Sequence, residues 1–404
     1  MKYPFGAVSI DKESRCLINK ILASKRVSNG KYVREFERSF AELIGTKEAV
    51  ALSSGTDADA LALAVLYDFG AKRGDAVIIP ALSFVATGSA VLQAGFKPVF
   101  VDVEPETLNI NPELIEEVIT EKTRAIMPVH LMGKPAKMDR INKIAKKHNL
   151  SVIEDAAQAY GAVYKGKNIG TLGDMAAFST YLAHIVTTIE GGVVATNRNE
   201  FAEILRSLRS HGRACKCNIC IVNTKSTYCR KRFKYGRDIR FYFERIGYSS
   251  KMNEIEAAVG IGSLKSYGKI ITERRRNLLT LLERFKKFDD YFTTIHEEKY
   301  ERIGPHAFAV IVREKAPFTR NQLTDFLAKN GVETRDLFAS MPTQCPGFYF
   351  LGYKLGSFPI AESIGNNGLH IGVHQDLKDK HIDYFIGLIE KFLKNEGHIS
   401  CTYS

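Results

Sequence analysis

The sequence lacks any hydrophobic run long enough to cross a membrane. Nowhere in its 404 residues do the ~20 consecutive apolar residues of a membrane-spanning helix occur. The first residues, MKYPFGAVSIDKES, also lack the apolar core of a secretory signal peptide. We therefore expect a cytoplasmic protein without a membrane partner.

Cysteines are few and odd in number, with seven in the whole chain. In a reducing cytoplasm such a set does not build a disulfide framework. Internal repeats and low-complexity tracts are missing too, which argues against a solenoid or a disordered chain. With 45% hydrophobic and 25% charged residues, the composition is that of a globular protein long enough for two domains.

A recognisable nucleic-acid-binding motif is absent, although the chain carries a net charge of +12. Its cations are scattered except between Arg206 and Arg245, where RKRFKYGRDIRFYFER mixes them with aromatic residues. Such a mixture can form a nucleic-acid stripe, a solvated loop, or a surface that attracts a small phosphorylated substrate. Without an accompanying motif we favour the loop or the substrate-attracting surface, and we expect no nucleic-acid partner.

Short β-type runs alternate with helical patterns through the first half of the chain. Most of these runs are continuous rather than alternating, as in strands that are covered on both faces. A typical helical pattern is VREFERSFAELIG, where Val33, Phe36 and Phe40 recur at helical spacing before Gly45. The alternation predicts an α/β fold with a doubly wound, largely parallel sheet of seven strands. The predicted strands are residues 49–53, 76–80, 98–103, 125–131, 151–156, 175–180 and 191–197.

The pattern changes after about residue 200. A basic, cysteine-bearing insertion covers residues 206–245, and a long amphipathic helical stretch follows it. We expect a large domain over residues 1–250, which includes the insertion, and a small C-terminal α/β domain over residues 251–404. The predicted elements of the small domain are strands 306–313 and 368–374 and helices 320–331 and 378–394.

Polar or aromatic residues follow several of the predicted strands. Ser53 to Thr56 form a small hydroxyl-rich turn that opens a helix, so they are either a phosphate cradle or a simple helix cap. Asp155 lies at the carboxyl end of a buried strand, where it belongs either to a site or to a helix cap. Phe84 follows another strand and could stack on a planar ligand or pack in the core. The residues alone leave these alternatives open.

Lysine is missing from the bend AAFSTYLAHIVTTIEGGVVATN, residues 176–197, whose most prominent polar side chain is His184. Between Asp155 and Glu190 the only lysines are Lys165 and Lys167, in the turn YKGKNIG. With an ordinary pKa of ~6.5, a histidine at such a bend suits a proton shuttle near neutral pH.

A set of motifs, taken in order, resembles one family. The motifs are SSGT, PALSFVATGSAVLQAGFKPVFVDVEPETLNI, AIMPVHLMGKPAKMDRI, VIEDAAQAYGA, GDMAAFSTYLAHIVTTIEGGVVAT and IGYSSKMNEIEAAVGIG. Together they resemble the DegT/DnrJ/EryC1/StrS family of sugar-nucleotide aminotransferases, over nearly the whole chain. The resemblance implies the fold type I architecture of enzymes that use pyridoxal phosphate, with a seven-stranded, mostly parallel sheet and a smaller C-terminal α/β domain. It also implies a homodimer in which the partner subunit completes each pocket.

The resemblance assigns cofactor-binding roles to residues that match the family's motifs. Gly55, Thr56 and Ser179 match the residues that hold the cofactor phosphate. Phe84 matches the aromatic residue that stacks on the pyridine ring, and Asp155 matches the carboxylate that pairs with the protonated pyridine nitrogen. Such a pair keeps the ring charged and therefore able to accept electrons from a carbanion.

Two further positions complete the expected cofactor site. Gln158 matches the residue beside the 3-oxygen of the ring. Ser249 follows Gly247 and Tyr248, where the family usually has an asparagine that reaches the phosphate of a neighbouring subunit. This departure leaves the contact between subunits open.

The main departure is at the bend, because His184 stands where the family's aminotransferases carry the Schiff-base lysine. Within the family, sugar 3-dehydratases show the same exchange. There pyridoxamine phosphate condenses with a 4-keto sugar nucleotide, and the histidine removes a proton from the cofactor so that the hydroxyl at sugar carbon 3 leaves. We therefore expect a dehydratase of a nucleotide-activated 4-keto-6-deoxy sugar, with an amino donor such as glutamate. The alternatives are a sugar-nucleotide aminotransferase and an inactive homologue with a binding role.

Four cysteines lie close together with the spacing C-x-C-x2-C-x8-C: Cys215, Cys217, Cys220 and Cys229. Four thiolates so close can hold zinc or an iron-sulfur cluster, or they are reduced thiols of a surface loop. The segment is similar to a run in the iron-sulfur branch of the 3-dehydratases, which works with a reductase. That branch takes one cysteine from just after its ED pair, where this chain has Ala156 and Ala157, so both metals stay open.

Overall fold

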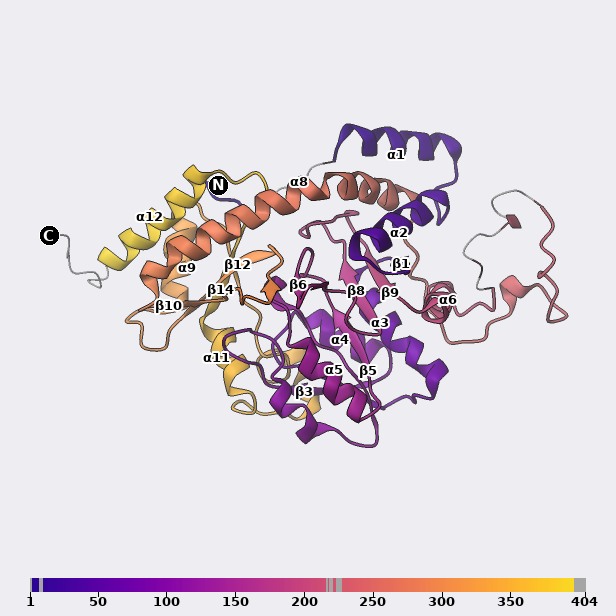
Figure 1. Cartoon of the computed structure of the whole chain (residues 1–404), viewed down its shortest axis with the longest axis horizontal. Coiled ribbons are helices and arrows are strands. Elements are labelled where there is room, and N and C mark those ends of the chain that lie inside the picture. Colours follow the sequence, from indigo (N-terminus) through magenta and orange to yellow (C-terminus); the bar gives the residue numbers. More distant parts are fainter. Residues whose placement is uncertain (1, 7–9, 216, 218–220, 223–226, 396–404) are drawn as a thin grey trace.

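The computed structural model describes residues 2–6, 10–215, 217, 221–222 and 227–395. Within these ranges no helix is both long enough and apolar enough to span a membrane. The chain forms a large seven-stranded sheet covered by helices, a four-stranded sheet in its C-terminal part and a small three-stranded sheet (Figure 1).

The seven-stranded sheet confirms the fold class predicted from the sequence. Its strand order is β1-β9-β8-β5-β4-β2-β3, and the pairs from β8 through β5, β4 and β2 to β3 are parallel. The β1–β9 and β9–β8 pairs are antiparallel. The strands are β1 (Glu48–Leu52), β2 (Ala76–Pro80), β3 (Lys97–Val101), β4 (Thr123–Ile126), β5 (Ser151–Asp155), β8 (Met175–Ser179) and β9 (Gly192–Thr196).

Helices cover both faces of this sheet, which explains why its strands are continuously apolar. On β1, Val50 and Leu52 pack into one core with residues of α3, α4 and α6, whereas Ala49 and Ala51 pack into a second core with residues of α2 and α5. Alternate residues of one strand therefore face opposite layers. The covering helices are α2 (Lys31–Ile44), α3 (Gly55–Ala64), α4 (Val85–Gln93), α5 (Met138–Lys147) and α6 (Asn199–Leu208).

A long helix, α8 (Glu254–Phe285), runs from the large sheet to the C-terminal part of the chain (Figure 1). It begins with a capping box, in which the Asn253 side chain accepts from the backbone of Glu256 and the Glu256 side chain accepts from that of Asn253. Helix α1 (Lys12–Ser24) packs along it.

The C-terminal part is built on the sheet β10-β12-β14-β13. Its strands are β10 (Phe292–Thr294), β12 (Ala307–Val312), β13 (Thr334–Asp336) and β14 (Gly368–Gly372), and its helices are α9 (Arg320–Lys329), α10 (Met341–Gln344), α11 (Pro359–Asn367) and α12 (Asp379–Asn395). The small sheet β11-β6-β7 joins β11 (Glu301–Arg302) to β6 (Val163–Tyr164) and β7 (Lys167–Asn168).

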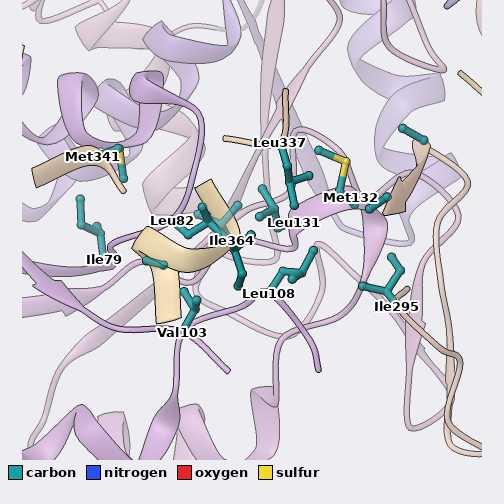
Figure 2. Close-up of a cluster of buried hydrophobic side chains, with 14 of the residues drawn as sticks. Ile79, Leu82, Val103, Leu108, Leu131, Met132, Ile295, Leu337, Met341 and Ile364 are labelled. Carbon is teal, nitrogen blue, oxygen red and sulfur yellow. The ribbon is translucent and has the colours of Figure 1, made fainter. Parts of the chain in front are cut away.

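One hydrophobic cluster joins the two halves of the chain. Figure 2 shows Ile79, Leu82 and Val103, from the large sheet and its connections, packed with Met341 and Ile364 of the C-terminal part. The backbone N–H of Met341 also donates to the carbonyl of Ala81 at 2.8 Å. C-terminal residues therefore lie against the carboxyl ends of the parallel strands. The proposed domain boundary at residue 250 remains a prediction.

Candidate active site

The bend between β8 and β9 is held as a tight loop by its threonines. Thr180 N donates to the Gly191 carbonyl, and Thr188 N donates to the Thr180 carbonyl, both at 2.9 Å. The hydroxyls of Thr180 and Thr188 share a 2.6 Å hydrogen bond. Thr187 N donates to the hydroxyl of Ser263 on α8 at 3.0 Å. The loop is therefore closed at its neck and fixed against α8.

His184 lies in the middle of this loop. Its ring centroid is 5.3 Å from that of His306 and 6.3 Å from that of Tyr181. Its Nδ1 atom is buried and has no hydrogen-bond partner among the described residues. Burial, followed by the charge of Arg274, lowers the pKa of His184 to about 4, so the ring is neutral at pH 7.

Asp155 ends β5 as a buried carboxylate with two hydrogen-bond donors. Its Oδ2 accepts from the hydroxyl of Thr87 at 2.7 Å, and Thr87 shares a 2.8 Å hydrogen bond with Ser83. Its Oδ1 accepts from the backbone N–H of Ala157 at 3.2 Å. Burial raises the pKa of Asp155, while these donors oppose the rise. A buried carboxylate of this kind is suited to a cationic ligand group.

The backbone of Ala157 links Asp155 to His184. Besides donating to Asp155, it forms a hydrogen bond with the imidazole that raises the pKa of His184. A neutral imidazole keeps a lone pair on one of its two ring nitrogens, and that nitrogen can accept a proton.

The start of α3 forms a cradle of the kind that holds a phosphate. Ser54 caps the helix by accepting from Asp57 N at 3.0 Å, and the N–H groups of Gly55 and Thr56 lie in the first turn, where a helix leaves such groups unpaired. A Cβ on Gly55 would lie 2.7 Å from Cβ of Ser179, so the helix end abuts that serine closely. The structure thus brings Gly55, Thr56 and Ser179 together, and their hydroxyls and N–H groups fit an anion.

Phe84 and Gln158 lie in different surroundings. Phe84 is 56% exposed just before α4, with its ring centroid 5.5 Å from that of Phe338, so its outer face is open to a planar ligand. The Phe338 ring contacts the His370 ring, and His370 contacts Phe5, which lines a cavity beside His184. Gln158 is half-buried, and its Oε1 accepts from Met132 N at 2.8 Å.

Ser249 lies next to Ser250, whose carbonyl accepts from Ser53 N at 3.2 Å at the entrance to the α3 turn. Ser249 is exposed and pairs through its backbone with Ser210. Cys217 and Cys229 are free thiols, Cys215 is half-buried, and no cluster of three or more metal-ligating side chains occurs in the part of the chain that the structure describes. Cys220 lies outside the described residues, so the four-cysteine metal site remains a prediction.

A cavity of about 530 Å³ opens beside His184, in the size range of small-molecule sites, ~300–1,000 Å³. Its wall carries hydroxyls of Tyr181, Thr187, Ser263 and Ser266. Cations and carboxylates balance along it: Lys269, Arg274, Arg335 and Lys378 against Asp11, Glu273, Glu333 and Asp376. Such a lining suits a ligand with many hydroxyl groups.

Arg274 and His306 were not predicted from the sequence as site residues. Arg274 is 5% exposed and donates to the carbonyls of Pro305, at 3.0 Å, and His306, at 2.7 Å. Burial lowers the pKa of Arg274 to about 10. The sequence does contain a sign that Arg274 is buried: it lies three and four residues before the buried Asn277 and Leu278, on the same face of α8.

Asp59 was missed as well. This α3 residue is 4% exposed, and its Oδ1 has no partner among the residues described. Burial, followed by the charge of Asp155, raises the pKa of Asp59 well above its ordinary value. Two coupled, buried carboxylates do not both ionise readily, so Asp59 retains a proton when Asp155 is charged. The signal was an acid inside the otherwise apolar run ADALALAVL.

The chain is similar to known proteins over nearly its whole length. A dTDP-4-dehydro-2,6-dideoxy-D-glucose 3-dehydratase of Saccharopolyspora spinosa is 34% identical, over 96% of this chain and 86% of that protein. A GDP-perosamine synthase of Caulobacter vibrioides is 32% identical, over 96% and 97%. A crystal structure of GDP-4-keto-6-deoxymannose-3-dehydratase with a trapped PLP-glutamate geminal diamine has a TM-score of 0.83 and 30% identity, over 96% of this chain and 99% of that one. Residues 8–390 match the family profile, and the chain belongs to the DegT/DnrJ/EryC1/StrS aminotransferase family.

Proposed function

We propose that this protein is an enzyme that uses pyridoxamine phosphate to remove the 3-hydroxyl of a nucleotide-activated 4-keto-6-deoxy sugar. One observation carries the proposal: a neutral histidine, His184, occupies the bend between β8 and β9 and presents an unpartnered Nδ1. The 3-dehydratases among its relatives support the same reaction class.

The residues present fit this cofactor. Asp155 would pair with the pyridine nitrogen, and Phe84 would stack on the ring. Gly55, Thr56 and Ser179 would hold the phosphate, and Gln158 would lie beside the 3-oxygen. When bound, the cofactor supplies an amine for the keto group and a ring that accepts electrons.

His184 manages the proton in this scheme. Its neutral imidazole accepts a proton at the ring nitrogen that carries the lone pair. Since burial keeps the imidazole neutral at pH 7, the lone pair is available without prior deprotonation. The hydroxyl-lined cavity beside it would bind the sugar and exclude bulk water.

The direct test is to mix the protein in its pyridoxamine phosphate form with a 4-keto-6-deoxy sugar nucleotide and analyse the product by mass spectrometry. The dehydratase proposal requires the loss of one water. Transfer of an amine without that loss would support the alternative, a sugar-nucleotide aminotransferase. Treatment with pyridoxal phosphate and borohydride separates the two further, because only an enzyme with a cofactor-binding lysine leaves a reduced lysine adduct.

We further propose that the enzyme is a cytoplasmic homodimer that takes its amine from glutamate, with residues 1–250 and 251–404 as its domains. A PLP-glutamate adduct in a related dehydratase supports the donor. The exposed Ser249 is available to reach a partner subunit. Light scattering tests the dimer. A visible spectrum with metal analysis of anaerobically purified protein tests whether Cys215, Cys217, Cys220 and Cys229 hold a metal and whether a reductase is needed.

A further inference from the structure

A second hollow lies between the α1–α2 connection, the end of α6 and the loop that precedes α8. Its volume is about 1120 Å³, which is larger than the cavity beside His184. Among the residues described, ten lysine or arginine side chains and one carboxylate, that of Glu254, line it. We call this hollow the basic groove. It shares no lining residue with the His184 cavity.

The carboxylate of Glu254 is already engaged by the start of α2. It accepts from Tyr32 N at 3.1 Å and from Val33 N at 2.9 Å. A Cβ on Gly30 would lie 2.9 Å from its Oε2, so the loop packs directly on the carboxylate. Glu254 therefore serves as the cap of α2, and its oxygens are not free to bind the groove's cations.

Three of the ten cations are paired with acids at the edge of the groove. The pairs are Arg206 with Glu48, Arg209 with Glu37 and Arg240 with Asp238. Arg209 also donates to the Ala51 carbonyl at 2.7 Å, and both members of its ion pair are buried. These three arginines are fixed parts of the wall.

The other seven cations form no ion pair within the described part of the chain. Five belong to α1, α2 and their connection: Lys20, Lys25, Arg26, Lys31 and Arg34. On the opposite wall lie Arg213, whose Nε is buried without a partner, and the half-buried Lys251. Burial, and then the charges of Arg213 and Arg209, lower the pKa of Lys251. Among the described residues, these seven cations therefore gather around the groove with no acidic side chain paired to any of them.

Such crowding destabilises the protein unless an anion occupies the groove. Guanidinium and ammonium groups on facing walls match a phosphate chain, which accepts several charge-assisted hydrogen bonds at once. Tyr32 also lines the groove, with Nζ of Lys31 4.5 Å from its ring centroid, and a base could stack there. We propose that the basic groove binds the diphosphate group of a nucleotide. The hollow form and the single tyrosine favour a small ligand over a nucleic-acid strand.

Ligand binding to the basic groove can be measured without turnover, so it does not depend on the dehydration chemistry. Calorimetric titration of the full chain with inorganic pyrophosphate, GDP and dTDP, at low and moderate salt, is the test. The groove variant is Arg26→Gln/Lys31→Gln, which changes two exposed side chains that form no ion pair with any described residue. The matched control is Lys143→Gln/Lys146→Gln, which removes two exposed cations from α5, far from the groove in the sequence and absent from its lining.

We expect all three probes to bind, with affinity that falls as salt rises, and the groove variant to bind about ten-fold more weakly while the control binds normally. If both variants lost affinity equally, the binding would be due to general charge attraction, and this result would overturn the proposal. Absence of binding by all three probes would overturn it too. A single-stranded oligonucleotide that binds more tightly than GDP and is lost in the groove variant would identify a nucleic-acid surface instead.

Steady-state kinetics of the groove variant would show whether the diphosphate belongs to the substrate or to a free nucleotide. A groove variant with raised KM for the sugar nucleotide at unchanged kcat would identify the substrate's own diphosphate. Unchanged KM together with lost GDP binding would identify a free nucleotide. Both results support the site, and a protein without any turnover would still report binding, so failure of the proposed function is distinguishable.

Discussion

The ring centroids of His184 and His306 lie 5.3 Å apart, with their planes inclined by 39°. Burial, and then the neighbouring His184, lower the pKa of His306 well below its ordinary value. Arg274 binds the carbonyl of His306 and disfavours a charge on either ring. The two imidazoles and the guanidinium therefore form a unit in which the arginine carries the charge and His184 stays a neutral base.

Replacement of His184 by asparagine should remove this base while keeping a polar side chain of smaller size. We expect turnover to fall by about 10²–10⁴-fold, the usual contribution of a general base. Cofactor binding, followed by absorbance, should change little, because Gly55, Thr56, Ser179 and Asp155 remain. If the His184→Asn variant retained turnover, His184 would not be the general base.

Arg274→Met should raise the pKa of His184 above about 4, because it removes the positive charge that ranks second among the causes of the depression. The value should stay below ~6.5, since burial, the largest cause, remains. An NMR titration of the imidazole measures this, and the acid limb of the activity profile should move in the same direction. Arg275→Met is the control, because Arg275 pairs with Glu297 outside the cavity lining. An unchanged pKa in Arg274→Met would refute the electrostatic link.

Sequence patterns were sufficient for the sheet but not for every strand end. β5 was predicted over residues 151–156 and spans Ser151–Asp155, because a buried parallel strand is a continuous apolar run. β4 was predicted to reach residue 131 but ends at Ile126. Pro128 lacks an N–H and cannot donate to the ladder, although its carbonyl still accepts from Asp155 N at 2.9 Å.

The same limit applies to the site. His184 and Asp155 are visible in the sequence because each follows a strand and has a distinctive side chain. The approach of His306 to His184 is not visible, since it depends on how the C-terminal sheet packs against the bend. Asp59 illustrates a third case, in which the residue was visible within an apolar run but its burial beside Asp155 required the fold.

Asp59→Asn should stabilise the protein at neutral pH. Folding raises the pKa of Asp59 above its value in the unfolded chain. The protonated carboxyl therefore contributes fully to the free energy of unfolding below the unfolded-state pKa, and this contribution is lost as pH rises through the folded-state pKa. The free energy of unfolding of the variant should therefore equal that of the natural protein near pH 4. At pH 8 it should be larger by on the order of 1–3 kcal/mol, the usual cost of an unsatisfied buried polar group. Urea unfolding across this range measures the difference.

The control for Asp59→Asn is Glu106→Gln, which changes an exposed acid that forms no ion pair within the described residues. Its effect should be small across the same range, because surface substitutions usually change stability by less than ~0.5 kcal/mol. A gain for Asp59→Asn that is independent of pH would point to packing rather than to the coupled carboxylates.

Gly55→Ala should weaken phosphate binding at the start of α3. The added Cβ would lie 2.7 Å from Cβ of Ser179, a distance that forces the helix end and β8 apart. Because the N–H groups of a first turn bind an anion only at close range, we expect the affinity for pyridoxal phosphate to fall by about ten-fold or more, measured by equilibrium dialysis. Gly268→Ala on α8 is the matched control: its Cβ meets nothing within 4 Å, and the exchange in a helix interior should stabilise by about 0.5–1 kcal/mol without changing cofactor affinity. Normal affinity in Gly55→Ala would show that the phosphate lies elsewhere.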